Sequence, residues 1–147
     1  MQAAEFEKGL LVLTAWRTSS GNGVNELFAI ACTLRNWVVP RPGQAVPDYK
    51  SYTEAVLHFW ENYPLRGFPK VNEPTLIDPN EGLFVCIDQV YNNTVPDITS
   101  SQAFPNGARH FGRARLAIPG SWFYDNILSR QHEHPLIGTF GSQQFYG

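Results

Sequence analysis

The chain has few cysteines and no excess of charge of either sign. Only 2 cysteines occur among 147 residues, and charged residues make up 16% of the chain. The formal net charge is -2, which argues against the basic surface that binding to bulk nucleic acid usually requires. Cys32 and Cys86 each lie in an apolar run, so we favour two reduced core thiols, with a disulfide between them as the alternative.

Targeting signals, repeats and common catalytic motifs are also missing. Residues 1–8 carry two glutamates and lack the basic-then-apolar order of a signal peptide, so we expect a cytoplasmic location. The chain contains no glycine-rich phosphate loop, no Gly-x-Ser-x-Gly motif and no complete set of metal ligands, and we expect no cofactor. His132 and His134 could share a strand face, but a solvated turn is the favoured interpretation. The length predicts one domain spanning residues 1–147.

The most apolar stretch, residues 22–39, predicts a helix around which the rest of the chain packs. It has almost no polar face, and such a helix must be buried nearly all round. Glu26 falls in its first turn, where a carboxylate suits the positive end of the helix dipole. Pro40 and Pro42 end it. The stretch is shorter than the roughly 20 apolar residues that a membrane span needs.

Local signals predict three further helices and a small sheet late in the chain. Helical spacing and capping residues predict helices at residues 3–16, 51–62 and 78–91, with a proline-rich loop at residues 63–77. Alternation over residues 108–117 predicts a strand, followed by a short helix at residues 122–129 and a second strand with a turn at residues 135–146. The fold class is therefore mainly α (α+β), with a small antiparallel sheet toward the C-terminus.

Three segments resemble those of the spore-cortex-lytic (SleB-type) cell wall hydrolases, a lysozyme-like group that cuts the glycan strands of peptidoglycan. Residues 28–36 (Phe-Ala-Ile-Ala-Cys-Thr-Leu-Arg-Asn) are similar to the family's alanine-rich central helix, which ends in a Leu-Asn-Arg-type signature. Residues 107–111 (Gly-Ala-Arg-His-Phe) and 137–146 (Ile-Gly-Thr-Phe-Gly-Ser-Gln-Gln-Phe-Tyr) resemble its Gly-Ala-x-His strand and its terminal segment. The resemblance implies a lysozyme-like helical domain.

The catalytic glutamate of that family has no counterpart here. The resemblance places it at the end of the first helix, where residues 13–20 read Leu-Thr-Ala-Trp-Arg-Thr-Ser-Ser. Glycoside cleavage needs a general acid, and neither Trp16 nor Arg17 can give and take a proton near neutral pH. Glu26 is the nearest acid downstream and is the fallback candidate for catalysis.

The same position could bind a ligand instead. An indole offers a flat platform to a base or a sugar face, and a guanidinium recognises phosphate or carboxylate. The resemblance implies one cleft formed by Trp16, Arg17 and His110. The candidate binding set also includes the residues expected at its rim, on its strand and in the final segment: Asn92, Phe111, Arg113 and Phe145. The alternatives are a core Trp16, a solvated Arg17, a structural His110 and an arginine row, Arg109, Arg113 and Arg115, that blunts a sheet edge.

Two functions follow from these observations. The first is a non-catalytic protein that holds a small anionic, ring-containing ligand, such as a nucleotide or an acidic sugar, on a degenerate hydrolase scaffold. By analogy, such a protein would suit a phage that sequesters a signal nucleotide or a glycan fragment in the host cytoplasm. The second is a working peptidoglycan hydrolase. A structural or virion-associated protein is a third possibility.

Overall fold

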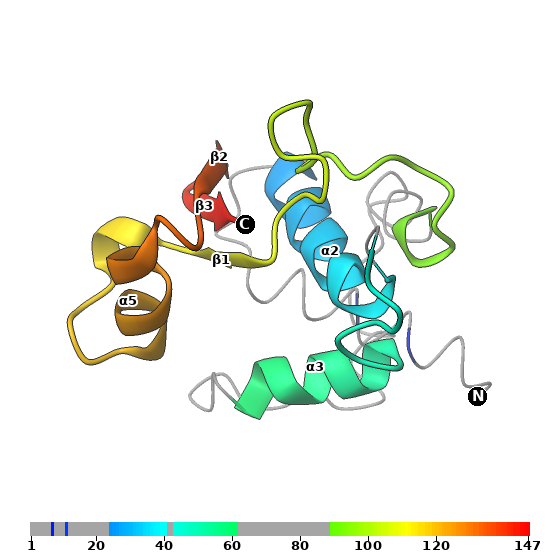
Figure 1. Cartoon of the computed structure of the whole chain (residues 1–147), viewed down its shortest axis with the longest axis horizontal. Helices are drawn as coiled ribbons and strands as arrows, with labels where there is room; N and C mark the ends of the chain where they lie inside the picture. The colour runs from blue at the N-terminus through cyan, green and yellow to red at the C-terminus, as the bar shows by residue number, and fades with distance from the viewer. Residues whose placement is uncertain (1–6, 8–10, 12–23, 41–42, 62–88) are drawn as a thin grey trace.

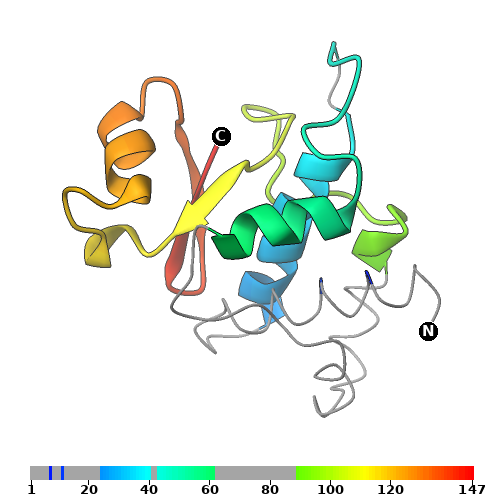
Figure 2. The same cartoon turned by 90° about the horizontal axis from the view of Figure 1, so that it is seen from below.

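The computed structural model describes residues 7, 11, 24–40, 43–61 and 89–147. Over these residues the protein is an α+β structure with a three-stranded antiparallel sheet. Figures 1 and 2 both place the sheet between the short helix α5 on one side and the helices α2 and α3 on the other. The elements, in chain order, are α2 (Val24–Val38), α3 (Tyr52–Glu61), β1 (His110–Gly112), the 3-10 helix η3 (Ala114–Leu116), α5 (Trp122–Asn126), the 3-10 helix η4 (Leu128–Arg130), β2 (Leu136–Phe140) and β3 (Gln143–Tyr146).

Helix α2 supplies much of the described core. Its side chains from Ala29 to Arg35 are all buried, as are Glu26 and Leu27. Phe28 and the last residues of the helix keep partial exposure, so burial is extensive but not complete on every side. Burial also raises the pKa of the Cys32 thiol to about 11 and keeps this free cysteine protonated at neutral pH. Cys86 lies outside the described residues. No helix among the described residues is long and apolar enough to cross a membrane.

Helix α3 begins where its capping residues predict. The Ser51 Oγ accepts a hydrogen bond from the Glu54 backbone N–H at 3.2 Å, and the Glu54 carboxylate accepts one from the Lys50 N–H at 3.1 Å. These bonds satisfy N–H groups that have no partner within a helix. Glu7 reaches the same helix end, because its carboxylate accepts hydrogen bonds from the Thr53 N–H and hydroxyl. The rest of the predicted first helix, and most of that predicted at residues 78–91, lies outside the described residues.

The strand predicted at residues 108–117 is shorter than expected. Ladder pairing covers only His110–Gly112, and the chain then turns into η3. The Ala114 N–H donates to the side chain of Gln144 rather than to a strand, and the Leu116 N–H donates to the Arg113 carbonyl. The predicted arginine row along one strand face was therefore wrong.

The C-terminal strands form a hairpin that contains the central strand of the sheet. The order is β1-β3-β2, and β3 pairs antiparallel with both neighbours. Gly141 occupies the turn with a φ of 63, a left-handed conformation that glycine adopts without steric cost. The predicted second strand with a turn is thus two strands. Ser121 caps α5 through its hydroxyl, but that helix ends at Asn126 rather than at residue 129, and η4 follows it.

A row of phenylalanines joins the helices to the sheet. Phe59 of α3 stacks on Phe111 of β1 with ring centroids 5.7 Å apart, and Phe111 stacks on Phe145 of β3 at 5.6 Å. Phe140 of β2 meets Phe145 edge-on at 5.2 Å. Aromatic pairs in these geometries stabilise beyond their buried area, by about 0.5–1.5 kcal/mol each. The row therefore fixes where β1 lies relative to α3.

Candidate functional site

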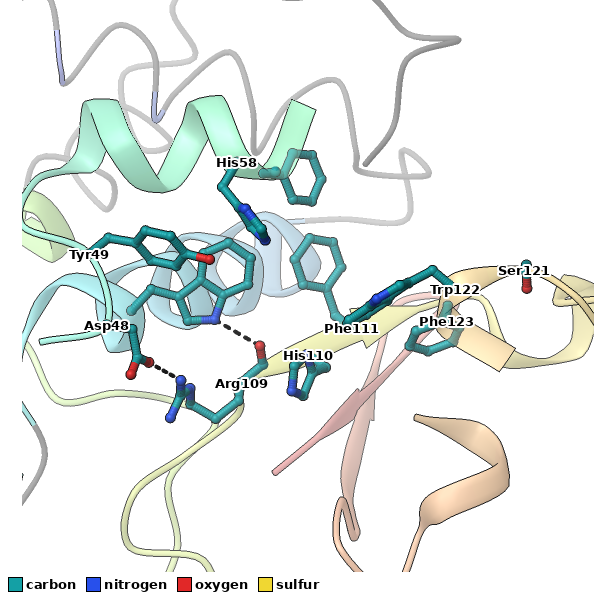
Figure 3. Close-up of a pocket in the computed structure, with 11 residues that line it drawn as sticks. Asp48, Tyr49, His58, Arg109, His110, Phe111, Ser121, Trp122 and Phe123 are labelled. Carbon is teal, nitrogen blue, oxygen red and sulfur yellow. Dashed lines mark hydrogen bonds and ion pairs between the residues drawn. The ribbon is translucent and has the colours of Figure 1, made fainter. Parts of the chain in front are cut away.

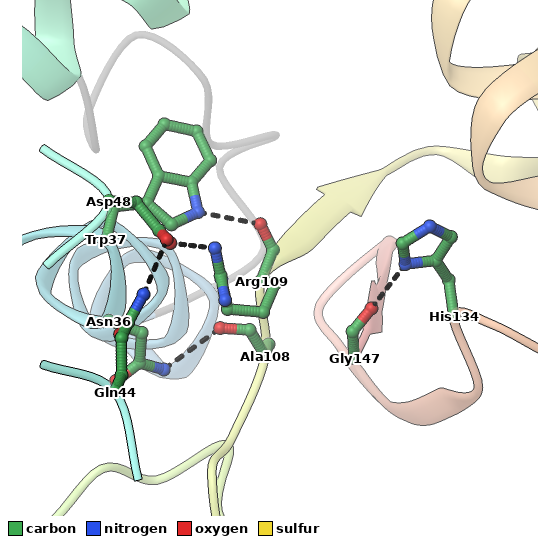
Figure 4. A network of polar contacts seen from close by, with 8 residues as sticks. All are labelled: Asn36, Trp37, Gln44, Asp48, Ala108, Arg109, His134 and Gly147. Atoms are coloured by element: carbon green, nitrogen blue, oxygen red, sulfur yellow. Dashed lines mark hydrogen bonds and ion pairs between the residues drawn. The ribbon is translucent and has the colours of Figure 1, made fainter. Parts of the chain in front are cut away.

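The C-terminal end of α2 holds the start of β1 through two neighbouring side chains. The Asn36 amide donates to the Ala108 carbonyl at 2.9 Å, and the Trp37 indole N–H donates to the Arg109 carbonyl at 2.8 Å (Figure 4). Because consecutive helix residues bond consecutive strand carbonyls, β1 has one position along α2. The resemblance segments at residues 28–36 and 107–111 thus contact each other.

A second set of bonds completes this α2–β1 clamp, which consists of Asn36, Asp97, Thr99, Gly107 and Ala108. The Asp97 carboxylate accepts bonds from the Asn36 amide at 2.7 Å and from the Thr99 hydroxyl at 2.6 Å. The Thr99 hydroxyl oxygen in turn accepts the Ala108 N–H at 2.8 Å. Gly107 has a φ of 67 and lies directly against these groups. The clamp is therefore polar, packed and largely shielded from water.

An aromatic pocket of about 540 Å³ opens beside the clamp. This volume falls in the range of about 300–1,000 Å³ typical of small-molecule sites. Its walls come from the end of α2, the segment before α3, α3 itself, β1 and α5 (Figure 3). The lining residues are Trp37, Asp48, Tyr49, His58, Phe59, Arg109, His110, Phe111, Ser121, Trp122 and Phe123.

The aromatic rings of the pocket form two walls. Figure 3 shows Tyr49 and His58 on one side, Trp122 and Phe123 on the other, and Phe111 between them. The first wall is packed internally, because the Tyr49 ring lies 5.2 Å from His58 and 5.8 Å from the Trp37 indole. Trp122 remains 53% exposed. A flat ligand can therefore reach its indole from solvent.

One ion pair lies in the pocket. The Arg109 guanidinium pairs with the Asp48 carboxylate, and both side chains are largely buried, at 17% and 25% exposure (Figure 4). The Gln44 amide donates to the other oxygen of Asp48 at 2.8 Å. The pair brings one positive and one negative charge, so these two residues together add no net charge to the pocket.

His110 adds a neutral donor and acceptor. Burial, with smaller contributions from nearby His134 and Arg109, lowers the pKa of His110 to about 4. Its ring meets His134 edge-on at 4.9 Å and lies 5.9 Å from Trp122. His134 Nδ1 lies 2.9 Å from the Gly147 carbonyl, so the turn predicted to be solvated is instead partly packed at this residue. At neutral pH the His110 imidazole is uncharged.

The structure places only some of the predicted binding residues at the pocket. His110 and Phe111 line the pocket. Phe145 is completely buried behind Phe111 and does not line the pocket. Asn92, which is exposed, and Arg113 lie outside the residues that line the pocket. Trp16 and Arg17 lie outside the described residues, so their shared cleft with His110 stays a prediction.

Glu26, the fallback catalytic residue, has a structural environment. It is completely buried, and its carboxylate accepts hydrogen bonds from the Ser142 N–H at 2.8 Å and the Gln143 side chain at 3.1 Å. It thus fastens α2 to the turn between β2 and β3 and does not line the pocket. A carboxylate that a glycan cannot reach cannot protonate its leaving oxygen.

Sequence reasoning missed most of the pocket. Trp37 was assigned to a helix buried on all sides, and Trp122 only to the start of a short helix. Asp48 and Tyr49 belong to no recognisable motif. His58 lies in a predicted helix, and the sequence indicated no partner for it. The prolines within residues 40–47, shortly before Tyr49, were the available signal, because segments between helices often carry binding residues.

Comparisons with protein-family models, curated proteins and solved structures found no match to this chain. Within residues 7, 11, 24–40, 43–61 and 89–147, no group of three or more His, Cys, Asp or Glu side chains could hold a metal ion. The geometry of the aromatic pocket therefore carries the functional interpretation.

Proposed function

We propose that the chain is a non-catalytic protein that binds a small anionic, ring-containing ligand, a nucleotide or an acidic sugar, in the aromatic pocket. The scaffold in this proposal is a degenerate lysozyme-like domain of the SleB type, with α2 as its central helix. A phage protein that sequesters a signal nucleotide or a glycan fragment in the host cytoplasm is the biological setting that we infer.

The aromatic pocket is the observation that supports binding. Tyr49 and Trp122 contribute aromatic rings from opposite sides, Arg109 contributes a guanidinium that pairs with Asp48, and neutral His110 offers one hydrogen-bond donor and one acceptor. Such a pocket, mostly apolar with a few placed polar groups, is typical of small-ligand sites.

The positions of the carboxylates support the absence of catalysis. Among the described residues that line the pocket, Asp48 is the only acid, and Arg109 and Gln44 already bind both of its oxygens. A general acid must present a carboxyl oxygen to the leaving group, and both oxygens of Asp48 accept hydrogen bonds from the protein. Glu26 lies elsewhere and is completely buried.

Two measurements test this proposal. The purified protein, incubated with purified cell walls, should release no more reducing ends or dye than the buffer does. Mass spectrometry of the denatured protein should detect a released ring-containing anion, or calorimetric titration with a panel of nucleotides and muropeptides should give at least one dissociation constant below about 1 mM.

Either of two results would overturn the proposal that the protein binds a ligand without cleaving it. Cell-wall cleavage that Glu26→Gln abolishes, in a variant that still melts cooperatively, would establish the alternative, a SleB-type peptidoglycan hydrolase. A protein that releases no small molecule and binds no member of the panel would instead favour a structural role.

A further inference from the structure

The aromatic pocket also discriminates between the two ligand classes of the proposed function, on which this inference rests. The pocket carries flat π surfaces, with Tyr49 next to the Trp37 indole on one side and Trp122 on the other. A nucleobase offers a flat π face that can stack on the Trp122 indole, which is 53% exposed. A sugar ring offers a weaker apolar face and is surrounded by hydroxyl groups that need polar partners.

The pocket has few polar side chains available to the hydroxyls of a sugar. Trp37 donates its indole N–H to a backbone carbonyl, and Asp48 and Arg109 bind each other. The Ser121 hydroxyl donates to the Ile118 carbonyl at 2.7 Å and accepts the Tyr124 N–H. These four groups already have partners in the protein, and His110, with one donor and one acceptor, offers fewer polar atoms than the hydroxyls of a sugar need. A sugar would bury hydroxyls without replacing the hydrogen bonds that they make to water.

The Asp48–Arg109 pair lies where an anionic substituent would bind. Asp48 belongs to the irregular segment between α2 and α3, whereas Arg109 precedes β1 and its backbone is held by the Trp37 indole and the Tyr146 carbonyl. Both side chains are largely buried but keep some contact with solvent, so water and salt can still compete for their charges. Gln44 would remain as a hydrogen-bond partner of Asp48 after displacement.

We propose that the pocket binds a planar heteroaromatic ring stacked on Trp122, and that a phosphate or carboxylate on that ring's substituent replaces Asp48 on Arg109. Asp48 then acts as an internal competitor that occupies the anion site in the free protein. The ligand class is a nucleotide rather than an acidic sugar.

Four probes test separately what the ring and the negative charge of the ligand contribute to binding. Adenosine 5′-monophosphate carries both a base and an anion, adenosine carries only the base, N-acetylmuramic acid carries only the anion, and N-acetylglucosamine carries neither. Calorimetric titration of the full chain at low salt should give the tightest binding for the monophosphate and weaker binding for adenosine. The two sugars should bind more weakly than either.

Two variants test the two halves of the proposal. Trp122→Ala should weaken both adenine probes about tenfold, since base stacking on an aromatic side chain is typically this large. Asp48→Asn should tighten the monophosphate about threefold, the size expected for loss of a competing ion pair that water partly screens, and should leave adenosine unchanged. Leu116→Ala is the control, because this leucine is 60% exposed and lies outside the pocket lining.

The outcomes distinguish this inference from the proposed function. If N-acetylmuramic acid binds and the adenine probes do not, the nucleotide inference is wrong and small-ligand binding stands. If Asp48→Asn weakens the monophosphate while its melting temperature matches the parent, Asp48 is part of the binding wall and not a competitor. If none of the four probes binds, the inference is overturned, and mass spectrometry of released molecules decides the broader proposal.

Discussion

Replacement of Gly107 by alanine should destabilise the protein far more than an ordinary glycine substitution. Gly107 has a φ of 67, in the left-handed region that disfavours any side chain with a Cβ. A Cβ built there would lie 2.8 Å from the Thr99 hydroxyl oxygen and 2.9 Å from the Asn36 amide nitrogen, and closer still to the Asp97 carboxylate. Real Cβ atoms essentially never approach other atoms so closely, so the α2–β1 clamp must shift.

The expected loss of unfolding free energy has two contributions. The left-handed conformation costs alanine about 1–2 kcal/mol. Displacing the Asp97 carboxylate from Asn36 and Thr99 removes hydrogen bonds to a charged group, each with a net contribution of about 1.5–3 kcal/mol. If one such bond is lost, the free energy of unfolding should fall by about 3–5 kcal/mol, a large fraction of the stability of a domain of this size.

Gly120→Ala provides a matched control. Gly120 also has a left-handed φ, 93, but no atom lies within 4 Å of the Cβ position. Its substitution therefore carries the backbone cost without the collision. Urea unfolding followed by tryptophan fluorescence should give a loss for Gly107→Ala that exceeds the control by at least about 1.5 kcal/mol. Equal losses would refute the idea that a packed polar clamp determines the position of β1.

Two further predictions concern the core and the pocket histidine. Leu34→Ala should lower the free energy of unfolding by about 2–5 kcal/mol, because Leu34 is completely buried, and Leu57→Ala, in a helix and 43% exposed, should cost much less in the same urea titration. The pKa of His110 falls from 6.5 to about 4 on folding, so the unfolded chain binds more protons between these values, and stability should decrease as pH falls through this window. The loss of unfolding free energy over this window is at most about 3 kcal/mol. His110→Gln should flatten the dependence of stability on pH. Parallel pH profiles for parent and variant would contradict the assignment of this dependence to His110.

Local chemistry made several elements predictable from the sequence. Ser51 and Glu54 mark the start of α3, and Pro40 follows the end of α2 by two residues, because caps and prolines act on the backbone next to them. The end of β1 was not predictable in this way. Gln144, which is distant in the sequence, takes the Ala114 N–H and diverts the chain into η3.

The site was only partly predictable for a similar reason. His110 and Phe111 were identified through a segment resemblance, and both line the pocket. Phe145 belonged to the same pattern but is packed behind Phe111, since an aromatic residue in a strand carries no sign of which face meets the core. Asp48 became relevant only through Arg109, which is 61 residues away along the chain.

The bonds that position the pocket have a consequence for how the protein folds. Asn36 and Trp37 bond carbonyls 72 residues away, and Glu26 bonds groups 116 and 117 residues away. Each doubling of loop length adds only about 0.6 kcal/mol of closure entropy, so these separations have little effect on stability. The separations have a larger effect on the folding rate, because contacts between distant residues form slowly. The helices and the terminal hairpin can form early from local contacts, whereas the pocket takes shape only when the two halves of the chain meet.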